Sequence, residues 1–269
     1  MRLTIVVQAR TGSSRLPNKI LMPLAGKPLL QRQLERIQAA DTGADLIVAT
    51  TDSPADDAVR DLCRELGIRC YSGHPTDLLD RHYRAVSATR PDAVVKIPSD
   101  CPLIDPEVIS LVLDFYRYAY RDYDFVSNLH PATWPDGNDV EVMSFAALET
   151  AWKEAKKPHE REHTTPFIWD QPDRFRIGNV IWPSGLDLSM SHRFTIDYPD
   201  DYEFIRSVYD DLHREGEPPF GVKAILDLLE AKPDLLKLNA RFAGVNWYRH
   251  HLDDLKSVTA ADTRHPESN

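Results

Sequence analysis

Residues 1–34 read MRLTIVVQARTGSSRLPNKILMPLAGKPLLQRQL, and this stretch decides the fold. Its first part, residues 3–7, is a short apolar, β-branched run of the length expected of a buried parallel strand. The run stops at Gln8, and a loop of small residues follows. This loop carries three cations: Arg10, Arg15 and Lys19. A strand followed by a cationic loop and a helix is typical of phosphate sites in open α/β sheets, where ligands lie at the carboxyl ends of strands. We therefore expect an anionic ligand here.

The alternative is that these cations only decorate a solvated loop, and their position alone does not decide between the two interpretations. The local charge favours an anion site. The first forty residues contain seven lysines and arginines against a single acidic residue, Glu35, in a chain whose formal net charge is -10.

The composition is that of an ordinary soluble globular protein, with 269 residues, 42% hydrophobic and 28% charged. The acidic balance argues against nucleic acid or a membrane surface as the main partner, although it is compatible with an enzyme that holds polyphosphates through magnesium. No apolar run approaches the roughly 18 residues of a membrane helix, and the chain starts on a core strand rather than a signal peptide. We expect a cytoplasmic protein. The three cysteines have neither an even count nor a metal-ligand spacing, so free thiols are expected.

Apolar strands alternate with amphipathic helices in the first hundred residues. Strands are predicted at 45–51, 68–71 and 93–97, and helices at 28–39, 54–66 and 78–89. This order predicts an α/β fold with a mostly parallel sheet covered on both faces, because parallel strands need crossover helices.

The second half is less regular. Strands are predicted at 124–127, 139–143, 176–182 and 194–197, and helices at 106–118, 146–154, 158–169, 198–213, 221–230 and 233–239. We expect one domain over residues 1–255, an insertion or dimerisation arm at about 130–193, and a flexible tail at 256–269. The arm is expected to form a homodimer, because its aromatic residues have no obvious place in the sheet.

Two aspartates follow apolar β runs and precede prolines. Asp100 ends the strand at 93–97, and Asp197 ends the run at 194–197. An aspartate after a strand is often only a turn former or helix cap, which suits Asp105 before Pro106 well. Asp100 and Asp197 fit that role less well, and oxygen ligands of this kind hold hard divalent cations. The pattern predicts that the two share one ion.

Further acidic and histidine side chains lie in the middle segment. Asp139 and Glu141 alternate with apolar residues, which predicts a half-exposed strand with both carboxylates on one face, or simply a solvated edge. His159, Glu160 and His163 lack a third ligand at a usable spacing, so a zinc site is not expected.

Five motifs resemble those of a known family when they are taken in order. They are QARTGSSRLPNK at 8–19, SDCPLID at 99–105, GNDVEV at 137–142, REHTTP at 161–166 and TIDYP at 195–199. Together they resemble the cytidylyltransferases that activate acidic sugars, the acylneuraminate and KDO synthetases, and most of all the branch named for spore-coat polysaccharide biosynthesis. The resemblance covers nearly the whole chain. One departure is Asn138, which stands where that branch often has leucine.

The resemblance implies a Rossmann-like nucleotide-diphosphosugar transferase fold and transfer of CMP from CTP to a hydroxylated acidic acceptor, with release of pyrophosphate. It implies the following roles. Arg10, Arg15, Lys19 and Asp100 are catalytic; Gln8, Ala9, Arg10, Gly12, Ser13, Arg15, Lys19, Thr51, Asp80, Arg81 and Ser99 bind the nucleotide; Asp139, Glu141, Glu162 and His163 bind the acceptor; Asp100 and Asp197 hold Mg²⁺. A surface salt bridge is the alternative for Asp80 and Arg81.

Two other functions compete with this one. A glycosyltransferase using a ready-made nucleotide sugar needs a DxD-like motif after the central strand, which Ser99-Asp100-Cys101 does not supply. A non-catalytic nucleotide-binding protein would not need the complete set of cations and carboxylates. The acceptor itself stays open among sugar acids, phosphonates and other small hydroxylated acids. Its anionic group has six candidate partners: Arg161, His163, Arg174, Arg176, His192 and Arg193.

Overall fold

A seven-stranded sheet forms the centre of the computed structural model, which describes residues 1–264. Its spatial order is β5-β4-β1-β6-β8-β7-β9. The strands are β1 Leu3–Gln8, β4 Asp45–Thr51, β5 Arg69–Gly73, β6 Ala93–Pro98, β7 Phe125–Ser127, β8 Glu141–Ser144 and β9 Ile177–Asn179. The four strands from β5 to β6 are parallel, β7 pairs in parallel with β9, and β8 runs antiparallel to both β6 and β7. The mostly parallel α/β sheet expected from the sequence is confirmed.

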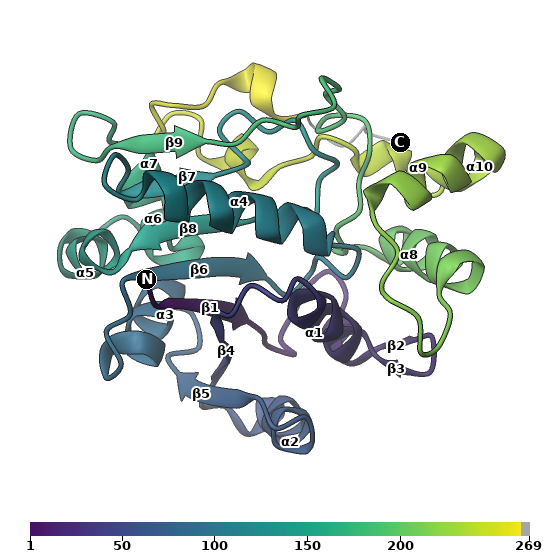
Figure 1. The fold of residues 1–269 in the computed structure, drawn as a ribbon, viewed down its shortest axis with the longest axis horizontal. Coiled ribbons are helices and arrows are strands. Elements are labelled where there is room, and N and C mark those ends of the chain that lie inside the picture. Colours follow the sequence, from purple (N-terminus) through teal and green to yellow (C-terminus); the bar gives the residue numbers. More distant parts are fainter. Residues whose placement is uncertain (265–269) are drawn as a thin grey trace.

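Helices cover both faces of this sheet (Figure 1). They are α1 Leu29–Ala39, α2 Asp57–Glu65, α3 Leu78–Ser87, α4 Pro106–Ala119, α5 Phe145–Glu154, α6 Pro158–His163, α7 Pro166–Trp169, α8 Pro199–Leu212, α9 Val222–Ala231 and α10 Asp234–Lys237. One hydrophobic core joins α1, α2 and α4 to the sheet, and a second joins α3, α5 and α7 to the opposite face. A third core packs α8 and α9 against the small hairpin of β2 (Pro23–Leu24) and β3 (Lys27–Pro28).

Two local predictions are wrong. Residues 194–197 form no strand; this segment is extended, and Ile196 donates a backbone hydrogen bond to the Asp100 carbonyl at 2.9 Å. Strand β8 is not half-exposed, because it lies between β6 and β7 and its Glu141 is only 3% exposed. The alternation of carboxylates and valines resembled an edge strand, whereas the buried carboxylate has a buried partner.

The segment at 130–193 belongs to the main sheet instead of standing apart from it. It supplies β8 and β9, and its aromatic residues are used in the cores. Trp134 stacks on Trp182 with ring centroids 4.8 Å apart, and Trp169 is buried in the second core. The aromatic residues that suggested a dimerisation arm therefore have partners within the chain. The predicted helix from residue 158 is divided into α6 and α7, because Thr164 between them has a φ of 73°.

Residues 240–264, called here the C-terminal segment, fold back over the end of β7 and β9 (Figure 1). Its Tyr248, Leu255 and Val258 are buried in the second core. Asp170 accepts hydrogen bonds from the backbone N–H groups of residues 256 and 257, at 2.8 and 2.7 Å. The expected tail at 256–269 is thus packed and hydrogen-bonded over 256–264, and the rest of it lies outside the described residues.

No helix within residues 1–264 combines the length and the apolar character that crossing a membrane requires.

Candidate functional site

A cavity of about 850 Å³ opens at the carboxyl ends of β1 and β6. At one end it is lined by the cationic loop after β1 and by Asp100 after β6. At the other end it is lined by the connection before β8, by α6 and by the C-terminal segment. We call these the phosphate end and the acceptor end, after the ligands that the sequence resemblance implies for the residues at each end.

The cationic loop is anchored by Asp56, which lies just after β4. Its carboxylate accepts two hydrogen bonds of 2.7 Å, from the backbone and the hydroxyl of Thr11, and another from the Thr51 hydroxyl. Burial opposes ionisation of Asp56, but the hydrogen bonds from Thr51 and Thr11 outweigh it and lower the pKa of this carboxyl. Thr51 therefore supports the loop and does not line the cavity. Sequence analysis missed Asp56, which looked like an ordinary residue of the first turn after a strand.

The two strand-end carboxylates meet at one ammonium group. Lys19 Nζ lies 3.2 Å from Asp100 Oδ2 and 3.0 Å from Asp197 Oδ1, and it donates to the Ile196 carbonyl. Burial lowers the pKa of Lys19, but Asp100 and Asp197 more than offset that and raise it. Asp100 and Asp197 thus lie together as the pattern predicts, but Asp197 follows an irregular segment instead of the expected strand, and the contacts of both with Lys19 were not predicted.

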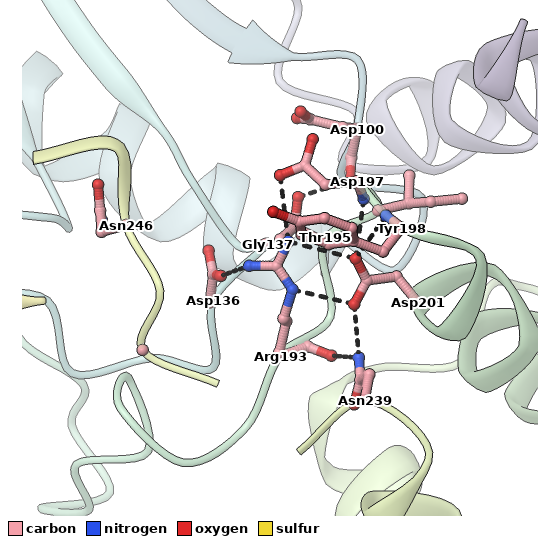
Figure 2. A network of polar contacts seen from close by, with 12 residues as sticks. Asp100, Asp136, Gly137, Arg193, Thr195, Asp197, Tyr198, Asp201, Asn239 and Asn246 are labelled. Atoms are coloured by element: carbon pink, nitrogen blue, oxygen red, sulfur yellow. Dashed lines mark hydrogen bonds and ion pairs between the residues drawn. The ribbon is translucent and has the colours of Figure 1, made fainter. Parts of the chain in front are cut away.

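Arg193 completes a buried ion-pair network around Asp197, which Figure 2 shows. Its guanidinium lies 3.1 Å from Asp197 Oδ2, 3.1 Å from Asp136 Oδ2 and 2.9 Å from Asp201 Oδ1. Arg193 is 3% exposed. Although burial raises the pKa of Asp197, Lys19 and Arg15 outweigh it and lower this pKa to about 2. Asp197 is therefore a firmly ionised carboxylate held by three cations.

Asp201 fixes the backbone on which Asp197 stands (Figure 2). Its Oδ2 accepts from the N–H groups of Asp197 at 2.9 Å and Tyr198 at 3.0 Å, at the start of α8. Asn239 donates to Asp201 Oδ1 at 3.0 Å and to the Arg193 carbonyl at 2.9 Å. The Asp201 carboxylate thus accepts hydrogen bonds from two backbone N–H groups, from Arg193 and from Asn239, while Asn239 Oδ1 is buried without a hydrogen-bond partner among the described residues. Asp201 and Asn239 escaped the sequence analysis because neither carries a local signal beyond that of a helix start and a helix end.

Gly137 allows the connection before β8 to approach this network closely (Figure 2). It has a φ of 102°, and a Cβ there would lie 2.7 Å from backbone atoms of Phe194 and Thr195. The Phe194 N–H donates to the Asp136 carbonyl at 2.7 Å. A side chain at 137 would therefore force Asp136 away from Arg193.

All four residues expected to bind the acceptor line the cavity. Glu141 forms an ion pair with Lys96 and accepts a hydrogen bond of 2.6 Å from Thr165. Burial, with Asp136 and Asp100 nearby, raises the pKa of Asp139 to about 8. Glu162 lies on the exposed side of α6.

The remaining member, His163, stacks on Trp247 of the C-terminal segment, with centroids 3.8 Å apart and an interplanar angle of 11°. Burial lowers the pKa of His163 to about 3, so this ring is neutral at pH 7. Trp247, Tyr248 and Arg249 also line the acceptor end and were missed. Their only sequence signal is the cluster NWYRHH at 246–251, which no periodicity connects to a strand or helix.

Most cations expected to meet an acceptor anion are already paired. The arginines pair as follows: Arg161 with Asp77, Arg174 with Glu154, Arg176 with Asp124, and Arg193 with three aspartates. His192 contacts the Ser191 hydroxyl at 2.9 Å. Among the cavity-lining residues in the described part of the chain, Arg10 and Arg249 form no ion pair. One lies at each end of the cavity.

Several predicted nucleotide contacts are not brought to the cavity wall. Three of the predicted contacts line the cavity: Gln8, Arg10 and Arg15. The others do not line it: Ala9, Gly12, Ser13, Lys19, Thr51, Asp80, Arg81 and Ser99. Asp80 pairs with Arg84 at 2.9 Å and accepts from Trp152 Nε1 at 2.7 Å, which is the salt-bridge alternative. Arg81 is buried and donates to the His74 carbonyl; burial, reinforced by Arg10, lowers its pKa to about 10.

Comparisons with known proteins agree with this architecture. Residues 4–218 match the cytidylyltransferase family profile. The chain is 29% identical to the spore coat polysaccharide biosynthesis protein SpsF of Bacillus subtilis, over 86% of this chain and 95% of that protein. It is 37% identical to a 3-deoxy-manno-octulosonate cytidylyltransferase of Anaeromyxobacter dehalogenans, over 59% of this chain and 66% of that protein.

A solved cytidylyltransferase from Leptospira borgpetersenii serovar Hardjo-bovis superposes with a TM-score of 0.81 at 28% identity, covering 88% of this chain and 97% of the other. The family expected from the five sequence motifs is therefore confirmed. With a nucleotidyltransferase sheet, a cationic loop and paired strand-end aspartates in place, the chain belongs to the cytidylyltransferase family.

Proposed function

We propose that this protein transfers CMP from CTP to a hydroxyl group of a small acidic acceptor and releases pyrophosphate. The observation that carries the proposal is the meeting of Asp100, Asp197 and Lys19 at the phosphate end, beside Arg10 and Arg15. Family membership supports the nucleotidyl transfer, and the separate acceptor end supplies room for a second substrate.

Such a transfer proceeds by attack of the acceptor oxygen on the α-phosphorus, so positioning and charge neutralisation supply most of the catalysis. Arg15 is suited to the triphosphate because its side chain is 47% exposed while it rests 2.6 Å from Asp197. An exposed ion pair is weak, so the guanidinium can exchange that carboxylate for a phosphate. Arg10, which has no carboxylate partner among the described residues, holds the same ligand from the other side of the loop.

Asp100 and Asp197 also suit a magnesium ion. Among the described residues, the Cys101 thiol at 3.7 Å is the only hydrogen-bond partner of Asp100 Oδ1, and movement of Arg15 to phosphate releases Asp197 Oδ1 from one of its two cations. Carboxylate oxygens are the ligands that Mg²⁺ prefers. When bound, the ion would neutralise phosphate charge, while Lys19 keeps the two carboxylates together.

The acceptor we propose carries a carboxylate that Arg249 binds. Four candidate arginines are paired with aspartates or glutamates: Arg161, Arg174, Arg176 and Arg193. Arg10 lies at the phosphate end. Arg249 donates to the Asn246 carbonyl at 2.9 Å and has no carboxylate partner among the described residues. Neutral His163 and Trp247 provide a flat apolar wall of the kind that packs on a sugar ring. The similarity to an octulosonate cytidylyltransferase supports a sugar acid.

The test is a pyrophosphate-release screen that crosses the four NTPs with sialic, octulosonic and phosphonate acceptors, with and without Mg²⁺. We expect release only with CTP, Mg²⁺ and one acceptor class, and the CMP adduct should be identified by mass. Release with no acceptor present, or consumption of a nucleotide sugar in place of CTP, contradicts the proposal.

We further propose a homodimer, because twofold symmetric dimers are the commonest assemblies of soluble proteins. Light scattering at working concentration tests it, and a monomer would refute it.

A further inference from the structure

Three potential metal ligands from two distant segments meet beside the acceptor end. His159 comes from α6, and His251 and Asp254 come from the C-terminal segment. One ligand atom from each lies within 4.8 Å of the other two. His251 Nδ1 is 3.9 Å from Asp254 Oδ2, and the rings of His159 and His251 are 4.9 Å apart. The sequence alone supplied no third ligand to His159, since its neighbours arrive only when the C-terminal segment folds back.

The two imidazoles have their lone pairs available. Within residues 1–264, neither the His159 ring nor the His251 ring makes a hydrogen bond. His159 is 3% exposed and lies beside His251, with ring centroids 4.9 Å apart. A neutral imidazole is the form that binds metal.

We propose that His159, His251 and Asp254 bind a transition-metal ion of the zinc class, with solvent in the remaining position. Zinc takes nitrogen and oxygen ligands at about 2.0–2.2 Å in tetrahedral geometry, which puts neighbouring ligand atoms about 3.4 Å apart. Side-chain shifts of about 1 Å would bring the three ligand atoms from their observed separations, which are at most 4.8 Å, to this spacing. Two imidazoles favour Zn²⁺, Co²⁺, Ni²⁺ or Cu²⁺ over Mg²⁺, so this site is chemically different from the Asp100–Asp197 pair.

Such an ion would clip the C-terminal segment to α6. The two already touch, because Lys157 Nζ donates to the Asp254 carbonyl at 3.2 Å. One turn after His159, His163 stacks on Trp247, and Arg249 lies two residues before His251. The metal therefore fixes the segment that carries the acceptor-binding side chains. Binding itself does not depend on the proposed function; only its effect on the acceptor does.

The direct test is titration of the chelator-treated full chain with Co²⁺, followed by visible absorption, and competition by Zn²⁺ and by excess Mg²⁺. We expect one equivalent with the spectrum of a nitrogen-ligated, low-coordinate ion, displaced by Zn²⁺ and unaffected by Mg²⁺. His159→Gln and His251→Gln should each weaken binding at least about tenfold, since even outer-shell changes cost that much.

Two control variants and one substitute variant accompany the Co²⁺ titration. His213→Gln removes a half-buried histidine just after α8, which is not one of the three proposed ligands, and should bind Co²⁺ as the parent does. Asp100→Asn should also leave the Co²⁺ spectrum unchanged, which separates this site from the phosphate end. If His159→Gln fails to fold, the exposed Asp254→Asn replaces it.

Limited proteolysis tests whether the metal holds the C-terminal segment against α6. Zn²⁺ should slow cleavage of this segment in the parent chain and not in His251→Gln. The proposal is overturned if the parent binds no Co²⁺ or Zn²⁺, or if both histidine variants bind as tightly as the parent.

Discussion

The two ends of the cavity are built in different ways. The phosphate end combines the loop after β1 and Asp100 after β6 with the segment that leads into α8, and its charges are arranged in ion pairs around Lys19 and Arg193. The acceptor end combines α6 with an irregular C-terminal segment and relies on aromatic stacking and a guanidinium without a carboxylate partner in the described chain. Loops at the carboxyl edge of the sheet form much of the first end, whereas a helix and the C-terminal segment, which pack against the sheet, form much of the second. We therefore expect changes at the phosphate end to act on stability and turnover, and changes at the acceptor end to act on acceptor binding.

The largest effect should come from Arg193→Met, which removes a buried cation from three aspartates. Breaking a buried ion pair from one side costs about 3–5 kcal/mol of unfolding free energy, so urea denaturation should shift strongly. Arg64→Met, at an exposed helical pair, is the matched control and should cost less than about 1 kcal/mol. Equal stability of the two variants would show that the network is not structural.

Asp100→Asn should lower pyrophosphate release by at least about a hundredfold, as expected when a preorganised charge at a reacting centre is lost. Its stability should fall less than that of Arg193→Met, because Lys19 loses one carboxylate but keeps its ion pair with Asp197 and its hydrogen bond to the Ile196 carbonyl. Asp114→Asn, on the exposed face of α4, serves as the control and should keep full activity. Normal turnover by Asp100→Asn would remove this residue from the catalytic group.

Arg249→Met should raise KM for the acceptor about tenfold to a hundredfold and leave KM for CTP unchanged, because a hydrogen bond to a charged group contributes about 1.5–3 kcal/mol. Steady-state kinetics with each substrate varied in turn measures both constants. A parallel rise in KM for CTP would mean that the two ends are not separate.

The smallest effect, counted per pH unit, is on the pH dependence of the free energy of unfolding. The pKa of His163 is lowered to about 3 from its usual value near 6.5, so below pH 6.5 the unfolded chain takes up a proton that the folded chain does not. Stability should therefore fall with decreasing pH through the window from about 6.5 to 3. His163→Gln should remove about 1.4 kcal/mol per pH unit from that slope in comparison with the parent chain. Denaturation at a series of pH values compares them, and identical slopes would contradict the prediction.

The same contrast explains how far the sequence leads. Asp100 and Asp197 could be paired in advance because each follows an apolar run, and Asp100 lies at the edge where the parallel strands end. Their ion pairs with Lys19, which was expected to bind phosphate, were not foreseen. Thr51 and Asp80 had equally suggestive positions, yet a nearby Asp56 and Arg84 hold them away from the cavity. Local pattern places a residue at an edge, but competition among neighbouring partners decides where its side chain points.

The parts that were missed depend on tertiary packing. Asp201 and Asn239 act through a buried arginine that the sequence presents as one of several cations. The C-terminal segment has no helical or strand period, so its return to α6, and with it the meeting of His159 and His251, could not be predicted. The family resemblance supplied roles for the phosphate end more fully than for the acceptor end.

The reversed direction of β8 has a consequence for how such a site can diversify. An antiparallel strand begins at the edge where its parallel neighbours end, so the connection from β7 into β8 crosses directly over the mouth of the cavity. The part of this connection before Asp136 can therefore change without shifting the register of β1 or β6. Asp136 and Gly137 cannot change as freely, because they hold the Arg193 network around Asp197. A single inverted strand thus brings to the cavity mouth one loop with a variable part and a part tied to the aspartates.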